Sequence, residues 1–213
     1  MLAAPDAVCE ALAARIAQRP KPDGPLFHRP DPLPPGNLKA GHVLQALGDR
    51  LPADAVVIEE CPSNRDEMMV RMPARQPLGF VSPAMGGLGW GLPASVGLKM
   101  GLPDRPVVAV LGDGSTVFGI QGFWSAAQYK VGPLIVVLKN GGYRIMDQLA
   151  ALQGGPPVWP SLPVDIAAIA EAFGCEALRI ADQSALEDAL DEVVPTLRER
   201  RSPLLLEVTV EPD

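Results

Sequence analysis

An acidic and an amide side chain stand at the two ends of one predicted β-α-β unit. Asp113 in GDGS and Asn140 in NGG lie 27 positions apart. Each follows an apolar run, at 107–111 and 134–138, and a helix-length segment separates the two runs. Parallel strands joined by a crossover helix end at the same edge of a sheet, so these two side chains can face one another.

These residue types predict a magnesium site that holds a diphosphate. One oxygen from each side chain, a backbone carbonyl and two phosphate oxygens are the hard ligands that Mg²⁺ prefers. The neighbouring glycines allow the backbone to turn sharply and to approach phosphate groups closely. They stand at positions 112, 114, 141 and 142.

The sequence around these residues resembles the thiamine diphosphate motif of the 2-oxo-acid decarboxylase and acetolactate synthase superfamily. A GDG tripeptide alone is a common turn. Here the similarity extends upstream through AMGGLGWGLPASVGLKMGLPDRPVVAVLGDGS and downstream through FWSAAQYK and NGGYRIM. Within the superfamily the chain most resembles benzoylformate decarboxylase. The resemblance covers roughly residues 37–213, which correspond to the carboxyl-terminal third of a full-length relative.

The resemblance implies a metal site and a diphosphate cradle. Asp113 and Asn140 would supply side-chain oxygens to the metal, and Gly142 would supply its carbonyl. The diphosphate would be held by backbone amides, the positive end of a helix and two hydroxyl groups. The residues implied are Ser63, Gly114, Ser115 and Tyr143. For both serines a simple helix N-cap is the alternative interpretation.

A second segment, Met85-Gly-Gly-Leu-Gly, is implied to hold the thiamine end of the cofactor. By resemblance, the Gly86 carbonyl accepts from the 4'-amino group of the aminopyrimidine. Leu88 would lie beneath the bend between the two rings and keep the cofactor folded. Alternatively, Leu88 is a core leucine and GGLG is a tight turn from strand to helix.

Three apolar residues after the metal loop are candidates for a substrate pocket. Ile145, Met146 and Leu149 follow the loop on a predicted short helix whose counterparts line the pocket in similar enzymes. They would suit an apolar 2-oxo acid. Helix residues that pack on the sheet would show the same spacing.

Two departures from the family pattern concern the metal and the catalytic groups. Lys139 stands where many relatives have the first asparagine of an Asn-Asn pair, and a cation there could weaken metal binding unless it points away or pairs with phosphate. The catalytic glutamate of the superfamily belongs to a pyrimidine-binding domain, which this sequence lacks. No catalytic residue is therefore expected here, and neither His28 nor His42 inherits the role of the decarboxylase histidines.

The function implied is that of a thiamine diphosphate- and magnesium-dependent lyase acting on a small 2-oxo acid. An acetolactate synthase-like carboligase, an acyl-CoA lyase and a noncatalytic module that keeps the fold are the alternatives. A nicotinamide dehydrogenase is suggested by Gly89-Trp-Gly-Leu-Pro-Ala, which lacks a clear long strand before it. Since such sites form between domains of two chains, we expect a pyrimidine-binding domain or subunit as partner, and a homo-oligomer.

Alternating apolar runs and helical segments predict a doubly wound, mainly parallel sheet with helices on both faces. Strands are expected at 55–60, 107–111, 134–138 and 204–210, helices near 38–51, 88–100, 116–130, 164–173 and 184–200, and a loop over the ligand edge at 150–163. Residues 37–213 would form this domain. Residues 20–36 are proline-rich and predict a linker, and 1–19 predict a helical stub of a preceding domain.

Composition restricts the partners. The formal net charge of −7 over 213 residues argues against nonspecific nucleic-acid binding and binding to anionic membranes. No apolar run has the roughly 18 residues of a membrane span, and no secretory signal opens the chain. Cys9, Cys61 and Cys175 form no CxxC pair, and their odd number and wide spacing fit the reduced, buried thiols of a cytoplasmic protein.

Overall fold

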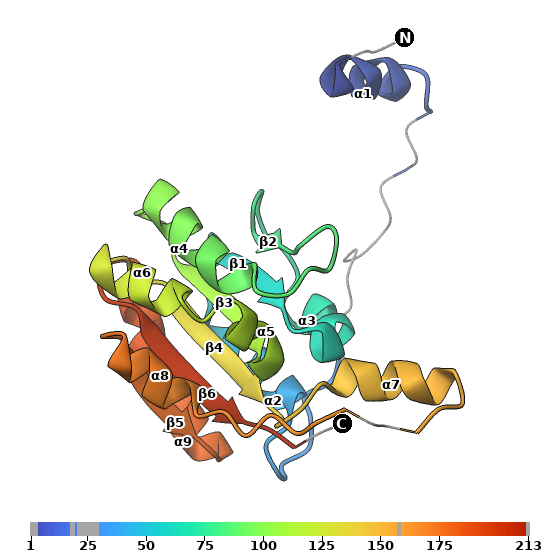
Figure 1. The fold of residues 1–213 in the computed structure, drawn as a ribbon. Helices are drawn as coiled ribbons and strands as arrows, with labels where there is room; N and C mark the ends of the chain where they lie inside the picture. The colour runs from blue at the N-terminus through green and yellow to red at the C-terminus, as the bar shows by residue number, and fades with distance from the viewer. Residues whose placement is uncertain (1–3, 18–19, 21–29, 157–158, 212–213) are drawn as a thin grey trace.

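The two central apolar runs form neighbouring strands of a parallel sheet (Figure 1). The structure is a computed structural model that describes residues 4–17, 20, 30–156 and 159–211. In these residues the sheet has six strands, all paired in parallel, in the order β2-β1-β3-β4-β6-β5. They are β1 (Val56–Glu60), β2 (Phe80–Val81), β3 (Val107–Gly112), β4 (Leu134–Lys139), β5 (Glu176–Ile180) and β6 (Leu204–Thr209). The predicted α/β fold class is confirmed.

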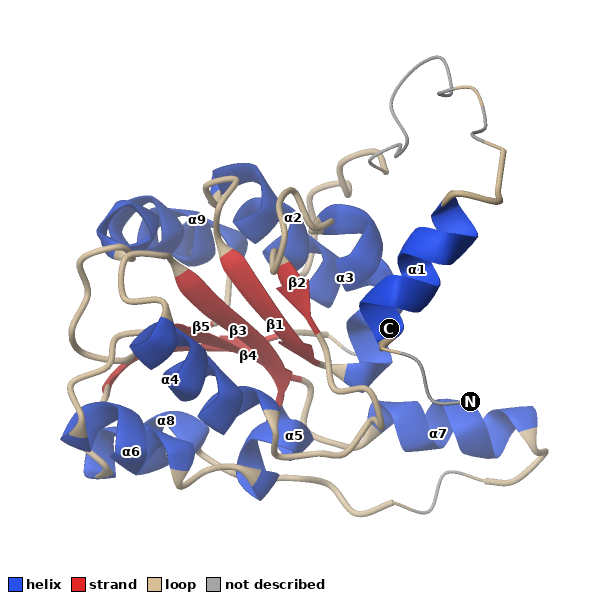
Figure 2. Ribbon diagram, turned by 90° about the horizontal axis from the view of Figure 1, so that it is seen from above, coloured by secondary structure: helices blue, strands red, loops and turns tan. Residues whose placement is uncertain are grey.

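Helices cover both faces of the sheet (Figure 2). The helices α2, α3 and α9 lie on one face, where Leu44, Met68 and Leu190 join one apolar cluster. On the other face lie α4, α6 and α8, and Leu92 and Phe123 join a second cluster. The helices are α1 (Pro5–Ala13), α2 (Ala40–Arg50), α3 (Arg65–Arg71), α4 (Gly91–Gly101), α5 (Asp113–Phe118), α6 (Gly122–Gln128), α7 (Arg144–Leu152), α8 (Ile166–Ala172) and α9 (Gln183–Val193), with 3₁₀ turns at Pro62–Asn64 and Val194–Thr196.

The order of the strands changes direction between β1 and β3. From β1 the chain crosses through α3 to β2 on one side, and then through α4 to β3 on the other side. In open α/β sheets, ligands bind at such a switch point, beyond the carboxyl ends of the strands. Gly112 pairs with Leu138, so the segments that follow β3 and β4 leave the sheet at almost the same level.

Several element boundaries differ from the predictions. The single helix expected at 116–130 is two helices, α5 and α6, separated at Gly119–Gln121. A Cβ on Gly119 would lie 2.7 Å from the Gly89 carbonyl oxygen, so the break lets the chain pass close to the GGLG segment. The helix expected at 184–200 ends as α9 at Val193, and a 3₁₀ turn that contains a proline follows.

Three elements were not predicted: α3, β2 and β5. β2 has only two residues, and β5 is an edge strand whose sequence EALRI buries only Ile180. Neither has the apolar run that marks a strand buried on both faces. The loop expected at 150–163 starts later, because α7 continues to Leu152.

The amino-terminal helix is present as α1, and it buries no residue. Pro20 and residues 30–36 belong to no helix or strand, while 21–29, with His28, lie outside the described residues. An isolated parallel bridge joins Lys39 to Glu211, close to the two ends of the proposed domain. The division into stub, linker and domain stays a prediction. Within the described residues, no helix has the length and apolar character of a membrane span.

Lys99 anchors the carboxyl end of α4 to a distant part of the chain. Its side chain is 4% exposed, and its Nζ donates to the carbonyl oxygens of Pro103 (2.9 Å) and Arg105 (3.0 Å). The carbonyl oxygens of Leu197 and Arg198 lie at 3.2 and 3.3 Å. Burial lowers the pKa of the Lys99 ammonium group. The helix that follows the GGLG segment is thus held at its far end by a buried charge.

We expect Lys99→Met to lower the free energy of unfolding by about 2 kcal/mol, because buried carbonyl oxygens lose their donor. Urea unfolding monitored by circular dichroism measures the change. Lys130→Met is the control, since Lys130 is exposed and its loss should cost no more than about 0.5 kcal/mol. Equal stability of the two variants would contradict the anchoring role.

Candidate functional site

The carboxyl ends of β1, β3 and β4 and the segments that follow them line a small, open cavity of about 40 Å³. Most of the predicted site residues line it: Ser63, Leu88, Asp113, Gly114, Ser115, Asn140, Tyr143 and Ile145. Gly86, Gly142, Met146 and Leu149, all within the described residues, are not part of the lining. A space of this size holds about one water molecule. Any larger ligand bound here must therefore extend beyond the cavity.

Asp113 joins the loops that follow the two central strands. Its side chain is buried, and its Oδ1 accepts from Gly114 N at 2.8 Å while its Oδ2 accepts from Gly141 N at 2.7 Å. Burial raises the pKa of the Asp113 carboxyl, and the amides of Gly141 and Gly114 oppose that rise. A carboxylate has roughly four lone-pair sites, so two remain for a metal or a further donor.

Asn140 and the glycines after it form an open loop beside Asp113. The Asn140 Oδ1 accepts from Gly142 N at 3.2 Å. Gly141 has a φ of +77°, and a Cβ on Gly141 or Gly142 would meet nothing within 4 Å. No group of three or more His, Cys, Asp and Glu side chains within the described ranges could hold a metal. A metal here would be coordinated by one carboxylate, by neutral oxygens of the protein and by oxygens of a bound phosphate compound. Mg²⁺ commonly binds in this way, with one or two carboxylates and phosphate oxygens.

Gly114 and Tyr143, predicted to serve the same diphosphate, are in contact. A Cβ on Gly114 would lie 2.7 Å from Cε1 of the Tyr143 ring, so the ring packs on bare backbone. Ser115 is the third residue of α5, whose N-cap is Gly112. Ser63 precedes Asn64, the N-cap of α3. The alternative interpretation of both serines as helix N-caps is therefore wrong.

The GGLG segment lies at the surface beside the cavity. Leu88 is 41% exposed, so it is not a core leucine. Gly86 has a φ of +65°, and a Cβ on it would meet nothing within 4 Å. An exposed leucine that lines the cavity is available to contact a ligand rather than the sheet.

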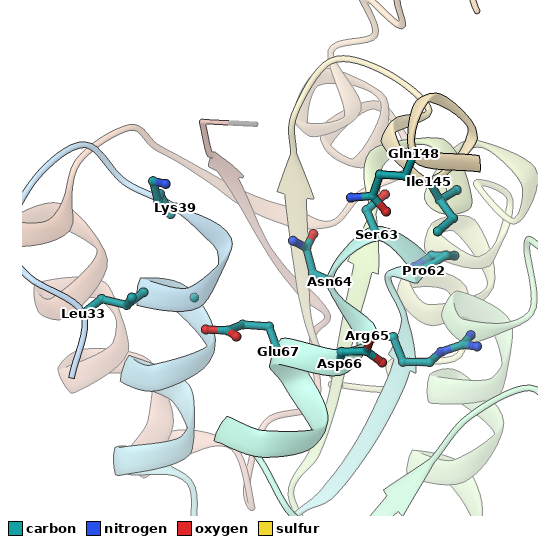
Figure 3. A pocket seen from close by; sticks show the side chains of 11 residues that line it. Leu33, Lys39, Pro62, Ser63, Asn64, Arg65, Asp66, Glu67, Ile145 and Gln148 are labelled. Atoms are coloured by element: carbon teal, nitrogen blue, oxygen red, sulfur yellow. The ribbon is translucent and has the colours of Figure 1, made fainter. Parts of the chain in front are cut away.

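The predicted substrate residues lie on α7, which buries no residue in the structure. Packing of this helix against the sheet is thus not the reason for its apolar positions. Ile145 lines the cavity, while Leu149 is 44% exposed. Ile145 also borders a larger groove of about 540 Å³, where Gln148 and Ser63 lie near it and Lys39 stands across from them (Figure 3). Neither Asp113 nor Asn140 lines that groove, so the smaller cavity is the candidate site.

Lys139 does not present a free charge to the metal loop. Its Nζ lies 2.8 Å from Oε1 of Glu207, which is buried on the neighbouring strand β6. The other oxygen of Glu207 accepts from the amides of Ile166 (2.9 Å) and Ala167 (3.1 Å) at the start of α8. This ion pair compensates the charge of Lys139. The lysine therefore does not act as a free cation that would weaken metal binding.

Two buried glutamates at the end of β1 were not singled out from the sequence. Glu59 accepts from Cys61 N (2.9 Å), Arg65 Nε (2.9 Å) and Ser82 Oγ (2.6 Å). Glu60 accepts from the backbone amides of Gly89 and Gly91. The signal was present as two consecutive acids that end the apolar run AVVIEE.

The contacts of Glu60 also argue against the dehydrogenase alternative. Gly89-Trp-Gly-Leu-Pro-Ala begins α4, but the amides of Gly89 and Gly91 are taken by a carboxylate of the same chain. In a dinucleotide-binding turn, such amides face the pyrophosphate. Burial raises the pKa of Glu60, and the same amides oppose that rise.

We expect Lys139→Met to destabilise the chain by about 1 to 3 kcal/mol, because Glu207 would keep a buried charge without its cation. Urea unfolding of Lys139→Met, Glu207→Gln and the double variant forms a double-mutant cycle. The double variant should lose less than the sum of the single losses. Strictly additive losses would show that the two side chains do not interact.

Comparisons with known proteins agree with the family resemblance seen in the sequence. Residues 66–208 match the family model "Thiamine pyrophosphate enzyme, C-terminal TPP binding domain". A benzoylformate decarboxylase of Pseudomonas aeruginosa is 36% identical over 95% of this chain and 39% of its own length. A Mycobacterium tuberculosis protein, provisionally named an acetolactate synthase large subunit, is 31% identical over 92% of this chain and 43% of its own.

A solved structure has the same fold. The crystal structure of benzoylformate decarboxylase from Polynucleobacter necessarius superimposes with a TM-score of 0.84 at 32% identity. The superposition covers 96% of this chain and 39% of that one. The chain therefore spans about two fifths of the length of the relatives that it matches.

Proposed function

Because the chain belongs to the thiamine pyrophosphate enzymes, as their C-terminal TPP-binding domain, we propose that it binds thiamine diphosphate and Mg²⁺ at the cavity around Asp113. In the complete enzyme it would serve a benzoylformate decarboxylase-like lyase that acts on 2-oxo acids. The observation that supports this most directly is the convergence of Asp113, Asn140 and bare glycine backbone at the switch point of the sheet.

The residues at this point have the chemistry that a magnesium diphosphate requires. Asp113 and Asn140 would supply one oxygen each, and Gly142 would supply its carbonyl. The amides around Gly114 and Ser115, the Ser115 hydroxyl, Tyr143 and Ser63 would hold the phosphate groups. Because α5 has only six residues, its helix dipole is small. The fixed backbone amides would therefore supply most of the attraction for the phosphate groups.

The remaining predicted residues would orient the reactive end of the cofactor and the substrate. Gly86 would accept from the aminopyrimidine through its carbonyl, and Leu88 would support the bend between the rings. When bound, thiamine diphosphate supplies an electron-accepting thiazolium for the loss of carbon dioxide. Ile145, with Met146 and Leu149 on α7, would exclude water and contact an apolar 2-oxo acid.

The small size of the cavity supports a partner that covers the cofactor. Most of a bound thiamine diphosphate would lie outside this open cavity of roughly 40 Å³. We propose that a pyrimidine-binding domain or subunit closes the site, supplies the catalytic glutamate and makes the working enzyme at least a homodimer. Cys61 and Cys175 are buried as expected, whereas Cys9 is exposed because α1 buries no residue. We also propose a cytoplasmic enzyme, since the three free thiols suit a reducing compartment.

An acetolactate synthase-like carboligase is the second candidate, because a relative provisionally so named matches most of the chain. It would use the same half-site with a different acceptor for the product carbon. The noncatalytic alternative rested on Lys139 as a sign of a degraded metal site. Its ion pair with Glu207 removes that argument.

We expect the chain to bind thiamine diphosphate only in the presence of Mg²⁺, and Asp113→Ala to weaken this binding at least about tenfold, because the metal loses its only carboxylate. Isothermal titration calorimetry with and without Mg²⁺ measures both effects. Asp104→Ala removes an exposed carboxylate outside the site and serves as the matched control. Equal affinities of the two variants would contradict the assignment of Asp113.

We expect no decarboxylation by the isolated chain, because the catalytic glutamate belongs to another domain. The measurement follows carbon dioxide release from benzoylformate at saturating thiamine diphosphate and Mg²⁺. A full-length relative serves as the positive control. Sustained turnover by the purified chain without a second polypeptide would refute the proposed half-site.

A further inference from the structure

Two consecutive buried carboxylates end β1, and together they hold both ends of one surface loop. The side chains of Glu59 and Glu60 are 0% and 1% exposed. Successive residues of a strand point to opposite faces, so the two carboxylates reach different neighbours. Burying a carboxylate is costly unless hydrogen bonds or a cation compensate it. The hydrogen-bond partners of the two carboxylates therefore indicate which segments they hold in place.

Glu59 binds Ser82, the residue that directly precedes the loop at 83–88. The Ser82 hydroxyl donates to Glu59 Oε2 at 2.6 Å, and Arg65 donates to the same oxygen at 2.9 Å. Arg65 compensates the charge of Glu59. The amino-terminal end of the loop is thereby attached to the sheet through an ion-paired carboxylate.

The loop ends where Glu60 holds it. Gly89 N donates to Oε1 at 2.5 Å, and Gly91 N donates to Oε2. Glu60 has backbone amides as its hydrogen-bond partners within the described residues, and it forms no ion pair there. Because α4 has no side-chain cap at Trp90, a carboxylate from a strand about 30 residues earlier caps this helix.

The carboxyl-terminal end of the loop packs closely against Glu60 and its neighbours. A Cβ on Gly91 would lie 2.6 Å from Leu111 Cδ2 and 2.9 Å from Glu60 Oε2. On the opposite side, Gly89 has a φ of +88°, and a Cβ on it would lie 2.8 Å from the backbone of Phe118. The backbone at Gly89 is confined between the carboxylate and the end of α5.

The residues between these two anchors are exposed and have few internal contacts. Gly86 N donates to Pro83 O at 3.3 Å, and residues 84–88 are exposed throughout. Leu88, which lines the cavity with Asp113, directly precedes the anchored Gly89. Its position over the cavity is thus set by the contact that follows it, rather than by packing of its own side chain.

We propose that Glu60 is a positioning residue that holds Leu88 and Gly86 over the cofactor site by binding the amides of Gly89 and Gly91. The inference rests on the proposed function, in which these two residues contact the thiamine end of the cofactor. Glu60 itself does not line the cavity. Its loss should affect the thiamine end of the ligand and leave the diphosphate end, which depends on Asp113 and Asn140, unchanged.

Glu60→Gln tests this with two ligands. The amide keeps the shape of the side chain, but its NH₂ group would face one of the two backbone donors. We expect the affinity for thiamine diphosphate with Mg²⁺ to fall about tenfold, and the affinity for inorganic pyrophosphate with Mg²⁺ to stay the same. Calorimetry on the full chain measures both. Asp182→Ala, which removes the carboxylate cap of α9, controls for a general loss of stability and should leave the ratio of affinities unchanged.

Amide hydrogen exchange tests the contact itself. In the wild-type chain, the amides of Gly89 and Gly91 should be protected while that of Gly87 exchanges rapidly. In Glu60→Gln, protection should be lost at whichever of Gly89 and Gly91 faces the new NH₂ group, and kept at Gly141, which Asp113 holds. Rapid exchange of Gly89 and Gly91 in the wild type would overturn the proposal even if the variant did not fold.

The binding results distinguish a failure of the proposed function from a failure of the role of Glu60. A wild-type chain that binds neither ligand contradicts the proposed function and the role of Glu60 with it. A wild-type chain that binds both, with the same affinity ratio in Glu60→Gln, contradicts the role of Glu60 alone. Equal weakening of both ligands in Glu60→Gln would also overturn it, because it would show a general structural effect.

Discussion

The carboxyl edge of the parallel sheet is held together by one buried carboxylate that bridges the segments after its two central strands. Asp113 accepts from Gly114 at the end of β3 and from Gly141 at the end of β4. These hydrogen bonds bring Asn140 and its open glycine loop to the mouth of the cavity. Since helices cover both faces of the sheet, this edge is where its strands can present polar groups to a ligand.

Buried acids recur along the same edge. Glu59 and Glu60 are the last two residues of β1, and Glu207 lies near the end of β6. Each of the three carboxylates accepts hydrogen bonds from backbone amides of a neighbouring segment. Glu59 and Glu207 are also paired with a cation. The edge is therefore built from carboxylates that hold loops in place. Asp113 differs in also facing the cavity.

This arrangement would leave a bound ligand incompletely enclosed. The cavity is small, Leu88 is partly exposed, and α7 has apolar residues but buries none. Leu88 lines the cavity and Leu149 of α7 is exposed, which suits the proposed second domain covering them together with a ligand. The length of the relatives, of which this chain spans about two fifths, fits the same view.

The sequence by itself determined the parallel sheet, its central strands and the meeting of Asp113 with Asn140. Those features depend on apolar runs and on glycine positions, which are local signals. It did not reveal β2, β5 or α3, because a two-residue strand and a half-exposed edge strand have no apolar run. The break between α5 and α6 depends on the close approach of Gly119 to Gly89, which no local pattern records.

The tertiary structure alone decided what the buried charges do. From the sequence, Lys139 was a possible defect of the metal site and Glu60 was one of two acids at a strand end. Their roles depend on partners 68 and about 30 residues away, Glu207 for the lysine and the Gly89 and Gly91 amides for the glutamate. Hydrogen bonds between segments so far apart are set by how the elements pack, and single-chain periodicity contains no information about them.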